Sequence, residues 1–272
     1  MEVLNKMNLK DKYQLVVAGG GLSGVAAAIA AAREGVDVLL IERYGFLGGM
    51  ATVGLVNPFM PYCIKKKVGG SDWDNKVNQG IFKEILENLE EYDGLHENKK
   101  TFSEEIMKFI LDRLVKKYGI KVLLHSYISE VKREDNKLLS VTVTNKSGKQ
   151  RIAADYFVDA TGDADVSALA GCEYKVGRDE DGLCQPMTLC FRLADVDTEK
   201  YNQKEIRKFA NEKYKEFQKA GEIKNPREDI LTFSHMVDDV LHFNSTRIVG
   251  KSPVDAGDLT EAEIEAREQV YE

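Results

Sequence analysis

The sequence is poor in cysteine and proline, and each shortage excludes a class of protein. Its 272 residues include four cysteines, Cys63, Cys172, Cys184 and Cys190, and no two of them form a CxxC pair. Disulfide scaffolds are small and cysteine-dense, and zinc sites need clustered ligands, so we expect free thiols and no metal site. Free thiols are typical of a reducing compartment, which predicts a cytoplasmic protein. Five prolines are too few for a collagen-like or proline-rich linker protein.

The sequence also lacks long hydrophobic runs and an excess of positive charge. Its longest run of small apolar residues spans positions 25–32, which is far short of the ~20 residues that cross a bilayer. The first 14 residues are polar and do not resemble a signal peptide. The chain has 38 Lys and Arg against 45 Asp and Glu, a net charge of −7. We therefore expect neither nucleic acid nor a membrane as partner.

What the sequence does have is a hydrophobic fraction of 43%, enough for a packed core in one large domain or two modest ones. Strand and helix patterns alternate at its start. Residues 13–18 form an apolar run typical of a buried parallel strand, residues 22–34 a small-residue helix, and residues 37–41 a second apolar run. This order predicts a βαβ unit.

Further elements are predicted along the rest of the chain. After a glycine-rich loop at 45–70 we expect helices at 78–89 and from a capping box of Thr101 and Glu104 to about Gly119. Strands at 121–124, 129–132, 138–144, 150–153 and 156–159 follow, the middle three as an antiparallel meander. Beyond residue 171 we expect a strand at 187–193, a helix at 204–220 and a helix at 260–271. The former helix turns Ile206, Phe209, Ala210 and Phe217 inward, and the latter begins with a capping box of Thr260 and Glu263.

A glycine motif joins the first strand to the first helix. Gly19, Gly21 and Gly24 form G-x-G-x-x-G, in which the glycines permit a tight turn, approach of a pyrophosphate and close helix packing. Glu42 ends the second strand, where its carboxylate can accept both hydroxyls of a ribose. An ordinary glycine-rich turn is the alternative, but the strand–turn–helix context and the terminal glutamate favour an adenine dinucleotide site.

Three later motifs indicate which dinucleotide binds. They are the LGGMAT run at 47–52 within a glycine-rich segment at 45–56, the ATGD run that opens residues 160–171, and QPMT at 185–188. With Glu42 and Arg43, they resemble the FAD-dependent oxidoreductase family of the glutathione-reductase-like flavoproteins. The resemblance implies an α/β fold: a Rossmann-like FAD-binding domain with a parallel sheet and a β-meander crossover, plus an α+β substrate or cap region. It places the FAD-binding domain at 1–56 and 100–172, and the second region at 57–99 and 173–272.

The same resemblance, together with the glycine motif, implies the residues that hold noncovalent FAD. They are Gly19, Gly21, Leu22, Ser23, Gly24, Glu42, Arg43, Gly48, Gly49, Met50, Ala51, Thr52, Ile128, Ala160, Thr161, Gly162 and Asp163. The backbone at Ile128 is expected to touch the adenine, and Gly48 and Gly49 to let the isoalloxazine approach. A plain flexible loop remains the alternative for these two glycines. Asp163 has a compatible second interpretation, as the N-cap of a helix that begins at Ala164.

Family members usually run well past this length, to a late strand that closes over the flavin. We therefore expect a chain that lacks its C-terminal portion, as a fragment or a truncated protein. The missing segment then comes from another chain, or the exposed sheet edge leads to a homo-oligomer.

No catalytic residue is evident, because a flavin carries hydride chemistry itself. Arg192, His235, His242 and Arg247 are candidates whose structural alternative is a surface or packing role. Cys184 and Asn57 are weaker candidates, for a place near the flavin and in the pocket, and Asn57 equally suits a turn before a proline. The leading hypothesis is an FAD-dependent oxidoreductase acting on a small substrate. The alternatives are a noncatalytic flavin- or nucleotide-binding domain and an NAD-dependent dehydrogenase.

Overall fold

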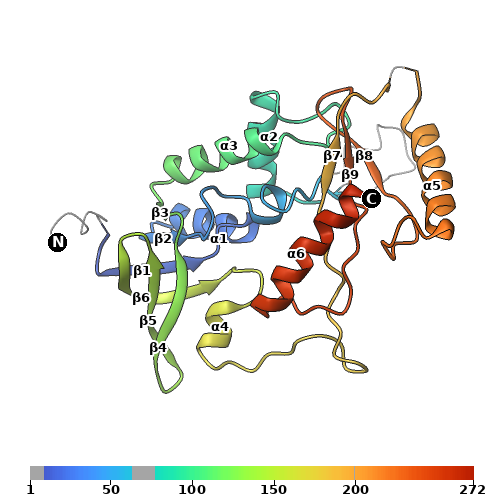
Figure 1. Cartoon of the computed structure of the whole chain (residues 1–272). Helices are drawn as coiled ribbons and strands as arrows, with labels where there is room; N and C mark the ends of the chain where they lie inside the picture. Colours follow the sequence, from blue (N-terminus) through green and yellow to red (C-terminus); the bar gives the residue numbers. More distant parts are fainter. Residues whose placement is uncertain (1–8, 63–76, 199) are drawn as a thin grey trace. The chain divides into compact units, whose positions relative to one another are not determined.

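The computed structural model describes residues 9–62, 77–198 and 200–272. Cys63 and the end of the predicted 45–70 loop lie outside these residues. Contacts divide the chain into two compact units (Figure 1). Unit 1 comprises Met1–Val53, Pro61–Gly94 and Glu104–Tyr174, and unit 2 comprises Gly54–Met60, Leu95–Ser103 and Lys175–Glu272.

Unit 1 is an α/β unit around a six-stranded sheet in the order β3-β2-β1-β6-β5-β4. The strands are β1 Lys12–Ala18, β2 Val38–Ile41, β3 Lys121–Leu123, β4 Tyr127–Glu134, β5 Lys137–Asn145 and β6 Gly148–Asp159. β1 pairs in parallel with β2 and β6, and β2 in parallel with β3, whereas β4, β5 and β6 form an antiparallel meander. This mixed sheet confirms the predicted Rossmann-like fold class.

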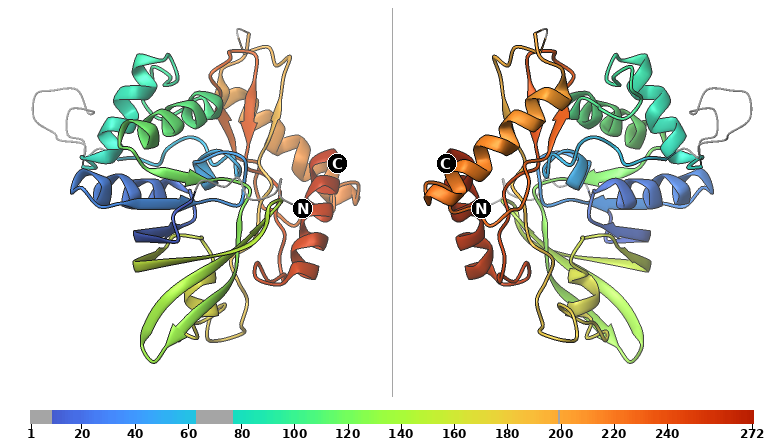
Figure 2. Two further views of the ribbon diagram at one scale, coloured as in Figure 1. Left: turned by 90° about the vertical axis from the view of Figure 1, so that its left-hand side faces the viewer. Right: turned by 90° about the vertical axis from the view of Figure 1, so that its right-hand side faces the viewer.

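Helices cover one face of the parallel strands (Figure 2). They are α1 Leu22–Arg33, α2 Ile81–Glu91 and α3 Glu104–Lys117. The 3₁₀ turn η1 Gly49–Ala51 contacts α1, and the short α4 Asp165–Leu169 contacts β4 and β6. α1 buries Val25, Ala28 and Ile29 against the sheet. A second cluster joins alternate residues of the parallel strands, such as Val16 and Leu39, to residues of the meander. The central parallel strands β1 and β2 are thus largely buried, as is usual for strands of a parallel sheet.

The structure merges two predicted strands into one. Residues 150–153 and 156–159 both belong to the 12-residue strand β6. Its first half pairs with β5 and its second half with β1, from Ala153 to Asp159. Charged and aromatic residues at Asp155 and Tyr156 are solvent-exposed, so they gave the appearance of a break. The long strand carries the chain directly from the meander to the ATGD turn.

Helix α2 changes the predicted division of the chain. We placed residues 57–99 in the second region, but α2 packs against α1 and α3 and belongs to unit 1. The carboxylate of Glu84 forms hydrogen bonds that link the three helices. Glu84 of α2 accepts hydrogen bonds from Arg33 Nη2 at 2.5 Å and from Lys117 Nζ at 2.7 Å. Tyr118, just after α3, donates to the same carboxylate at 2.8 Å.

Glu84→Gln is expected to lower the free energy of unfolding by about 1 kcal/mol, since partly exposed ion pairs contribute little each but three bonds converge here. Burial raises the pKa of Glu84, and the bonds from Lys117 and Tyr118 outweigh it, so its net pKa is lowered. The contribution is therefore present above the unfolded-state pKa, about 4.3, and is lost as pH falls through the folded-state value. Urea unfolding at neutral and acidic pH measures it. Glu87→Gln, on the same helix, is the control, because Glu87 pairs with Lys83 of α2 itself and its loss leaves the bonds from Glu84 to α1 and α3 intact.

Unit 2 contains a three-stranded antiparallel sheet in the order β7-β9-β8 with two helices. The elements are β7 Phe191–Leu193, α5 Gln203–Ala220, β8 Thr232–Ser234, β9 Leu241–Phe243 and α6 Ala256–Tyr271. The α+β character of this region and both helices match the prediction, and the strand expected at 187–193 is shorter. In α5, however, Phe209 is 63% exposed and Phe217 40%, whereas Tyr214 is buried. The predicted inward face is therefore wrong at Phe209 and Phe217, whereas Ile206 and Ala210 are half-buried.

Both predicted capping boxes are wrong because the helices begin elsewhere. α3 begins at Glu104, so Thr101 lies before its cap and its Oγ1 accepts a bond from Asn98 instead. α6 begins at Ala256 with Asp255 as N-cap, which places Thr260 inside the helix. Its hydroxyl donates to the carbonyl of Ala256.

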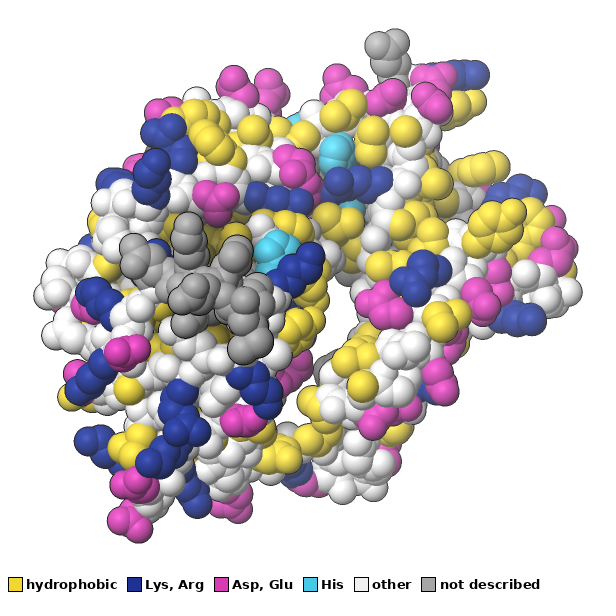
Figure 3. Space-filling model, turned by 60° about the vertical axis from the view of Figure 1, so that its left-hand side comes forward, with side chains coloured by type: hydrophobic (Ala, Val, Ile, Leu, Met, Phe, Trp, Pro, Cys, Tyr) yellow, Lys and Arg dark blue, Asp and Glu magenta, His cyan; other side chains and the backbone are white. Residues whose placement is uncertain are grey.

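The surface carries charges of both signs. Basic and acidic side chains are interspersed over the face drawn in Figure 3. Among the helices that the structure describes, none has the length and apolarity that a membrane crossing needs.

Candidate functional site

The first glycine-rich loop runs from β1 into α1. Gly19 has φ +95°, and a Cβ there would lie 2.2 Å from the carbonyl oxygen of Ala160, so no other residue fits. Gly24 lies in the first turn of α1, where a Cβ would meet the carbonyl oxygen of Gly19 at 1.8 Å. By contrast, a Cβ on Gly21 would meet nothing closer than the Gly49 Cα, at 3.9 Å. Gly19 and Gly24 therefore have no room for a side chain, whereas Gly21 has room for one.

No side chain of the protein caps the N-terminus of α1. Gly21 is its N-cap, and its first turn holds no acidic residue. Leu22 is half-buried and Ser23 is exposed at this end. The first amides of a helix have no intrahelical acceptor and carry a partial positive charge, so this end suits an anion.

The second glycine-rich loop lies on the first. The amide of Gly48 donates to the carbonyl of Gly20 at 2.8 Å, and a Cβ on Gly49 would lie 2.9 Å from the Gly21 Cα. Thr52 is buried and its Oγ1 donates to the carbonyl of Leu47 at 2.8 Å. Ala51 is buried beside it, and Met50 is 68% exposed. These contacts pack the second glycine-rich loop against the first.

Glu42 directly follows β2, and its carboxylate accepts bonds from both of the loops around it. The side chain is 5% exposed. Its Oε2 accepts the amide of Gly20 at 2.7 Å, and its Oε1 accepts the amide of Tyr44 at 2.8 Å. A carboxylate has about four lone-pair positions. Both oxygens therefore keep acceptor capacity for hydroxyl groups while the backbone fixes their orientation.

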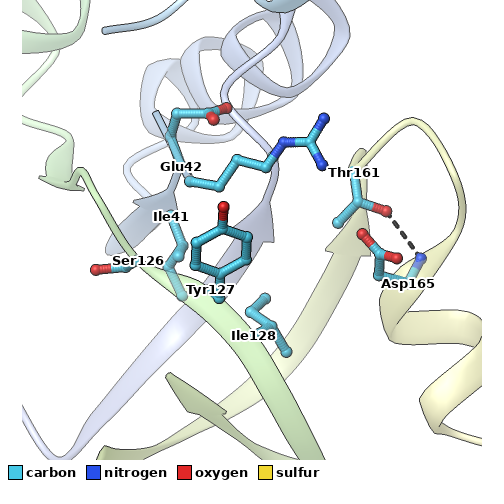
Figure 4. A pocket seen from close by; sticks show the side chains of 9 residues that line it. Ile41, Glu42, Ser126, Tyr127, Ile128, Thr161 and Asp165 are labelled. Atoms are coloured by element: carbon cyan, nitrogen blue, oxygen red, sulfur yellow. Dashed lines mark hydrogen bonds between the residues drawn. The ribbon is translucent and has the colours of Figure 1, made fainter. Parts of the chain in front are cut away.

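A pocket opens beside Glu42 (Figure 4). Five residues predicted from the sequence line it: Gly19, Glu42, Arg43, Ile128 and Thr161. They come from the ends of β1, β2 and β6 and from the start of β4. The carboxyl ends of the parallel strands thus bring distant parts of the sequence to one place, where α/β folds hold their ligands.

Four further lining residues were missed: Ile41, Ser126, Tyr127 and Asp165. Tyr127 is 59% exposed, and Ser126 is buried and bonded to Asn145. The predicted strand at 129–132 began too late to include Tyr127, where β4 begins, and Ser126 directly precedes that strand. The available signal was that Tyr127 and Ile128, directly before the predicted strand, are both residues common in strands.

The ATGD turn closes the far side of this pocket. Asp159 accepts bonds from the amide and hydroxyl of Thr161, at 3.2 and 2.7 Å, and from those of Ser167, both at 2.8 Å. Burial raises the pKa of Asp159, but these bonds outweigh it and the net pKa is lowered. Gly162 has φ +99° and nothing within 4 Å of a Cβ. Asp159 therefore fixes the conformation of the ATGD turn through its bonds to Thr161 and Ser167.

Asp163 does not cap the helix that follows. The N-cap of α4 is Ala164, and the amide of Asp165 is taken by Thr161 Oγ1 at 2.9 Å. Asp163 is exposed, so the capping interpretation is wrong. The pKa of Asp165 is raised by burial and by the nearby charge of Asp163, while Arg43 opposes the shift. Charges of both signs thus face this end of the pocket.

The candidates in unit 2 do not gather at one place. His242 and Arg192 are cross-strand partners on β9 and β7, and His242 is buried. Arg247 lies near α6, where its backbone bonds Gln269. His235 lines a separate cavity.

The remaining candidates are Asn57, which has a structural role, and Cys184, for which the described contacts show no role. Asn57 is buried and its Nδ2 donates to the carbonyl of Phe102 at 2.6 Å, which joins two segments of unit 2. Cys184 is a half-buried free thiol, and burial raises the pKa of the Cys190 thiol. Within the described residues, no three His, Cys, Asp or Glu side chains are placed to hold a metal ion.

The residues of unit 1 fit the phosphates and ribose of an adenine dinucleotide. The bare N-terminus of α1 and the open Gly21 suit a pyrophosphate, and Glu42 suits a ribose.

Comparison with known proteins identifies the class. Residues 14–272 match the family of FAD dependent oxidoreductases. The chain belongs to this family, whose cofactor is FAD.

Individual relatives are distant. Protein FixC of Azorhizobium caulinodans is 27% identical over 175 residues, which are 60% of this chain and 39% of FixC. The chain thus spans about two fifths of this curated relative. The L-proline dehydrogenase of P. horikoshii superposes with a TM-score of 0.55 at 15% identity, covering 94% of this chain and 76% of that one. A geranylgeranyl bacteriochlorophyll reductase-like protein of Thermoplasma acidophilum gives 0.52 at 15% identity, with 94% and 61% covered. These structures share the fold.

Proposed function

We propose that this chain holds FAD noncovalently in unit 1 and serves an oxidoreductase that acts on a small-molecule substrate. The arrangement that carries the proposal is the uncapped N-terminus of α1 at the open Gly21, beside the buried carboxylate of Glu42. Bound FAD supplies the hydride or electron-pair transfer between the substrate and an acceptor. We further propose that the site is of the glutathione-reductase-like type, in which the ATGD turn and the second glycine-rich loop complete the cofactor site.

Each part of the site has a separate task in this proposal. The amides of Gly21, Leu22 and Ser23 bind the pyrophosphate, and Gly19 and Gly24 keep these amides in place. Glu42 accepts the ribose hydroxyls and, as an anion, disfavours a 2′-phosphate. Arg43 and the Ile128 backbone contact the adenosine in this proposal. The ATGD turn contributes Ala160, Thr161, Gly162 and Asp163, and the second glycine-rich loop contributes Gly48, Gly49, Met50, Ala51 and Thr52 at the flavin.

Purification of the chain and titration with FAD and NAD test the proposal. We expect the visible absorbance of a bound oxidised flavin, quenched flavin fluorescence on binding, and bleaching when the flavin is reduced under anaerobic conditions. Binding of NAD but not FAD would favour the dehydrogenase alternative. If FAD binds but no hydride donor reduces it, the chain is a noncatalytic flavin-binding domain.

Glu42→Ala is expected to weaken FAD binding by about 1.5–3 kcal/mol, or roughly 10- to 150-fold, the usual range for bonds to a charged group. The substitution also leaves the amide of Gly20 without its acceptor, so the melting temperature should fall. Fluorescence titration on folded protein measures the affinity. Glu84→Gln serves as the control, since that carboxylate joins helices α1, α2 and α3. Unchanged affinity in Glu42→Ala would show that Glu42 is not the ribose ligand.

A further inference from the structure

Unit 2 contains a cavity formed by residues that take no part in the proposed FAD site. Its volume is about 360 Å³, within the usual range of ~300–1,000 Å³ for small-molecule sites. Its wall comes from β7, β9, α5, the segment 223–230 and the C-terminal turn of α6. Segments that lie far apart in the sequence therefore meet around this cavity.

One face of the small sheet and one face of α5 form much of the wall. Phe191 and Leu193 both line it and are two residues apart on β7, a spacing that puts side chains on the same face of a sheet. Phe243 of β9 is the cross-strand partner of Phe191, and the centroids of their stacked rings are 4.9 Å apart. The lining positions of α5 have the spacing of one helical face: Ala210, Lys213, Tyr214 and Phe217.

The uncharged polar side chains of the wall have partners within unit 2. The hydroxyl of Tyr214 donates to two backbone carbonyls, each at 3.0 Å. Asn225 Nδ2 donates to the carbonyl of Ser245 at 2.8 Å, and Ser245 Oγ bonds the amide and the carbonyl of Leu231. The side chain of Gln269 likewise bonds a backbone amide and a backbone carbonyl. These groups therefore have protein partners before any ligand binds.

The charges of the wall balance. Lys213 and Glu272 are the charged side chains among its lining residues. Lys213 Nζ donates to Glu216 at 2.7 Å, and the carboxylate of Glu272 accepts the amides of Lys224 and Asn225, at 2.9 and 3.3 Å. The wall thus favours neither sign of charge, and an ionic ligand would lose its water without gaining a dedicated partner.

The apolar part of the wall is the part that a ligand can cover. Leu193 is 51% exposed and Phe217 is 40% exposed, and removing such surface from water favours binding. Aromatic rings also favour offset or edge-on contact with other rings, and the wall contains the rings of Phe191, Tyr214, Phe217 and Phe243. A peptide suits the cavity less well, because its amides and carbonyls need partners and the polar side chains of the wall are already bonded.

We propose that this cavity binds a small uncharged compound with an aromatic ring system, in contact with α5 and the β7–β9 pair. The proposal goes beyond the flavin site, since every residue that carries it lies in unit 2. It is tested in the absence of FAD, so its failure leaves the proposed function untouched.

Titration with 2-naphthol, which is uncharged at neutral pH, tests the class of ligand. Isothermal titration calorimetry of the full-length chain should show saturable binding. 2-Naphthoate should bind at least about tenfold more weakly, because its carboxylate loses water without a partner. Decahydro-2-naphthol has the same carbon skeleton without aromatic rings, and it should bind about two- to tenfold more weakly.

Two exposed phenylalanines of α5 provide a matched pair that locates the ligand. Phe217 lines the cavity, whereas Phe209 is 63% exposed and does not. We expect Phe217→Ala to lower the affinity for 2-naphthol at least about threefold, through loss of a ring contact. Phe209→Ala should bind as the wild type does. Melting temperatures without ligand show whether both variants are folded.

Filling the cavity is the second, independent test. Ala210→Leu adds apolar atoms at a lining position and should abolish 2-naphthol binding. Ala220→Leu makes the same change at an exposed position of α5 that does not line the cavity, and it should bind normally. The proposal is overturned if 2-naphthol does not bind, if 2-naphthoate binds equally well, or if the members of either pair behave alike. It is also overturned if sedimentation shows a dimer that Phe217→Ala dissociates, since the cavity would then be an interface between copies.

Discussion

Gly21→Val is expected to abolish FAD binding while the fold persists. Gly21 has φ −63° and ψ 174°, a backbone conformation that valine adopts readily. A Cβ there meets no atom closer than 3.9 Å, so the protein has room for the added atoms. That room is where the proposed pyrophosphate must approach the amides of α1, and a branched side chain would exclude it.

Two measurements on this variant separate folding from binding. The melting temperature without ligand should stay within a few degrees of the wild type, and the fluorescence titration with FAD should show no binding. Ala30→Val adds a branched side chain on the exposed face of the same helix, and it should bind FAD normally. A Gly21→Val protein that purifies with bound FAD would refute the assignment of this loop.

The βαβ unit could be predicted from the sequence because its signals are local. Each apolar run, the small-residue helix and the glycines between them depend on neighbours within a few residues. Glu42 could be placed at a strand end for the same reason. The sequence could not predict that its carboxylate binds the amides of Gly20 and Tyr44. That contact depends on how the loops after β1 and β2 fold together.

Errors arose where long-range contacts override local patterns. The exposed Asp155 and Tyr156 resemble a turn, yet β6 continues through them because its two halves have different partners. Phe209 and Phe217 are apolar but exposed on α5, and Tyr214 is buried there because its hydroxyl donates to the carbonyls of Asn225 and Arg227. A hydrophobicity pattern contains no information on such a partner.

The same reason explains what was missed at the pocket. Ser126 and Tyr127 lie between two predicted strands, and nothing in their types indicates a ligand site. They reach Glu42 because β3 pairs with β2 and the amide of Ser126 donates to the carbonyl of Glu42 at 3.0 Å. Resemblance to a family identified Ile128, one residue further along. The neighbours became visible only through sheet pairing.

Gly24→Ala is expected to have the opposite effect to Gly21→Val and to destabilise the fold itself. Alanine is the better helix former by up to about 1 kcal/mol, so propensity alone predicts a gain. The added Cβ would, however, lie 1.8 Å from the carbonyl oxygen of Gly19 and 3.3 Å from the Cβ of Ala160. The close contact is with backbone, which cannot rotate away, so α1 must move off the β1–β6 pair.

The cost of that movement should reach or exceed the roughly 1–3 kcal/mol typical of overpacked cores. We expect a clear drop in the urea midpoint, or insoluble protein, in the absence of any ligand. Gly21→Ala, three residues earlier, is the matched control because its Cβ would meet no atom closer than the Gly49 Cα, at 3.9 Å, and its unfolding curve should resemble that of the wild type. Equal stability of the two alanine variants would contradict the close packing of α1 on Gly19. A stability difference without FAD, together with the loss of FAD binding in Gly21→Val, would assign one glycine to the fold and the other to the ligand.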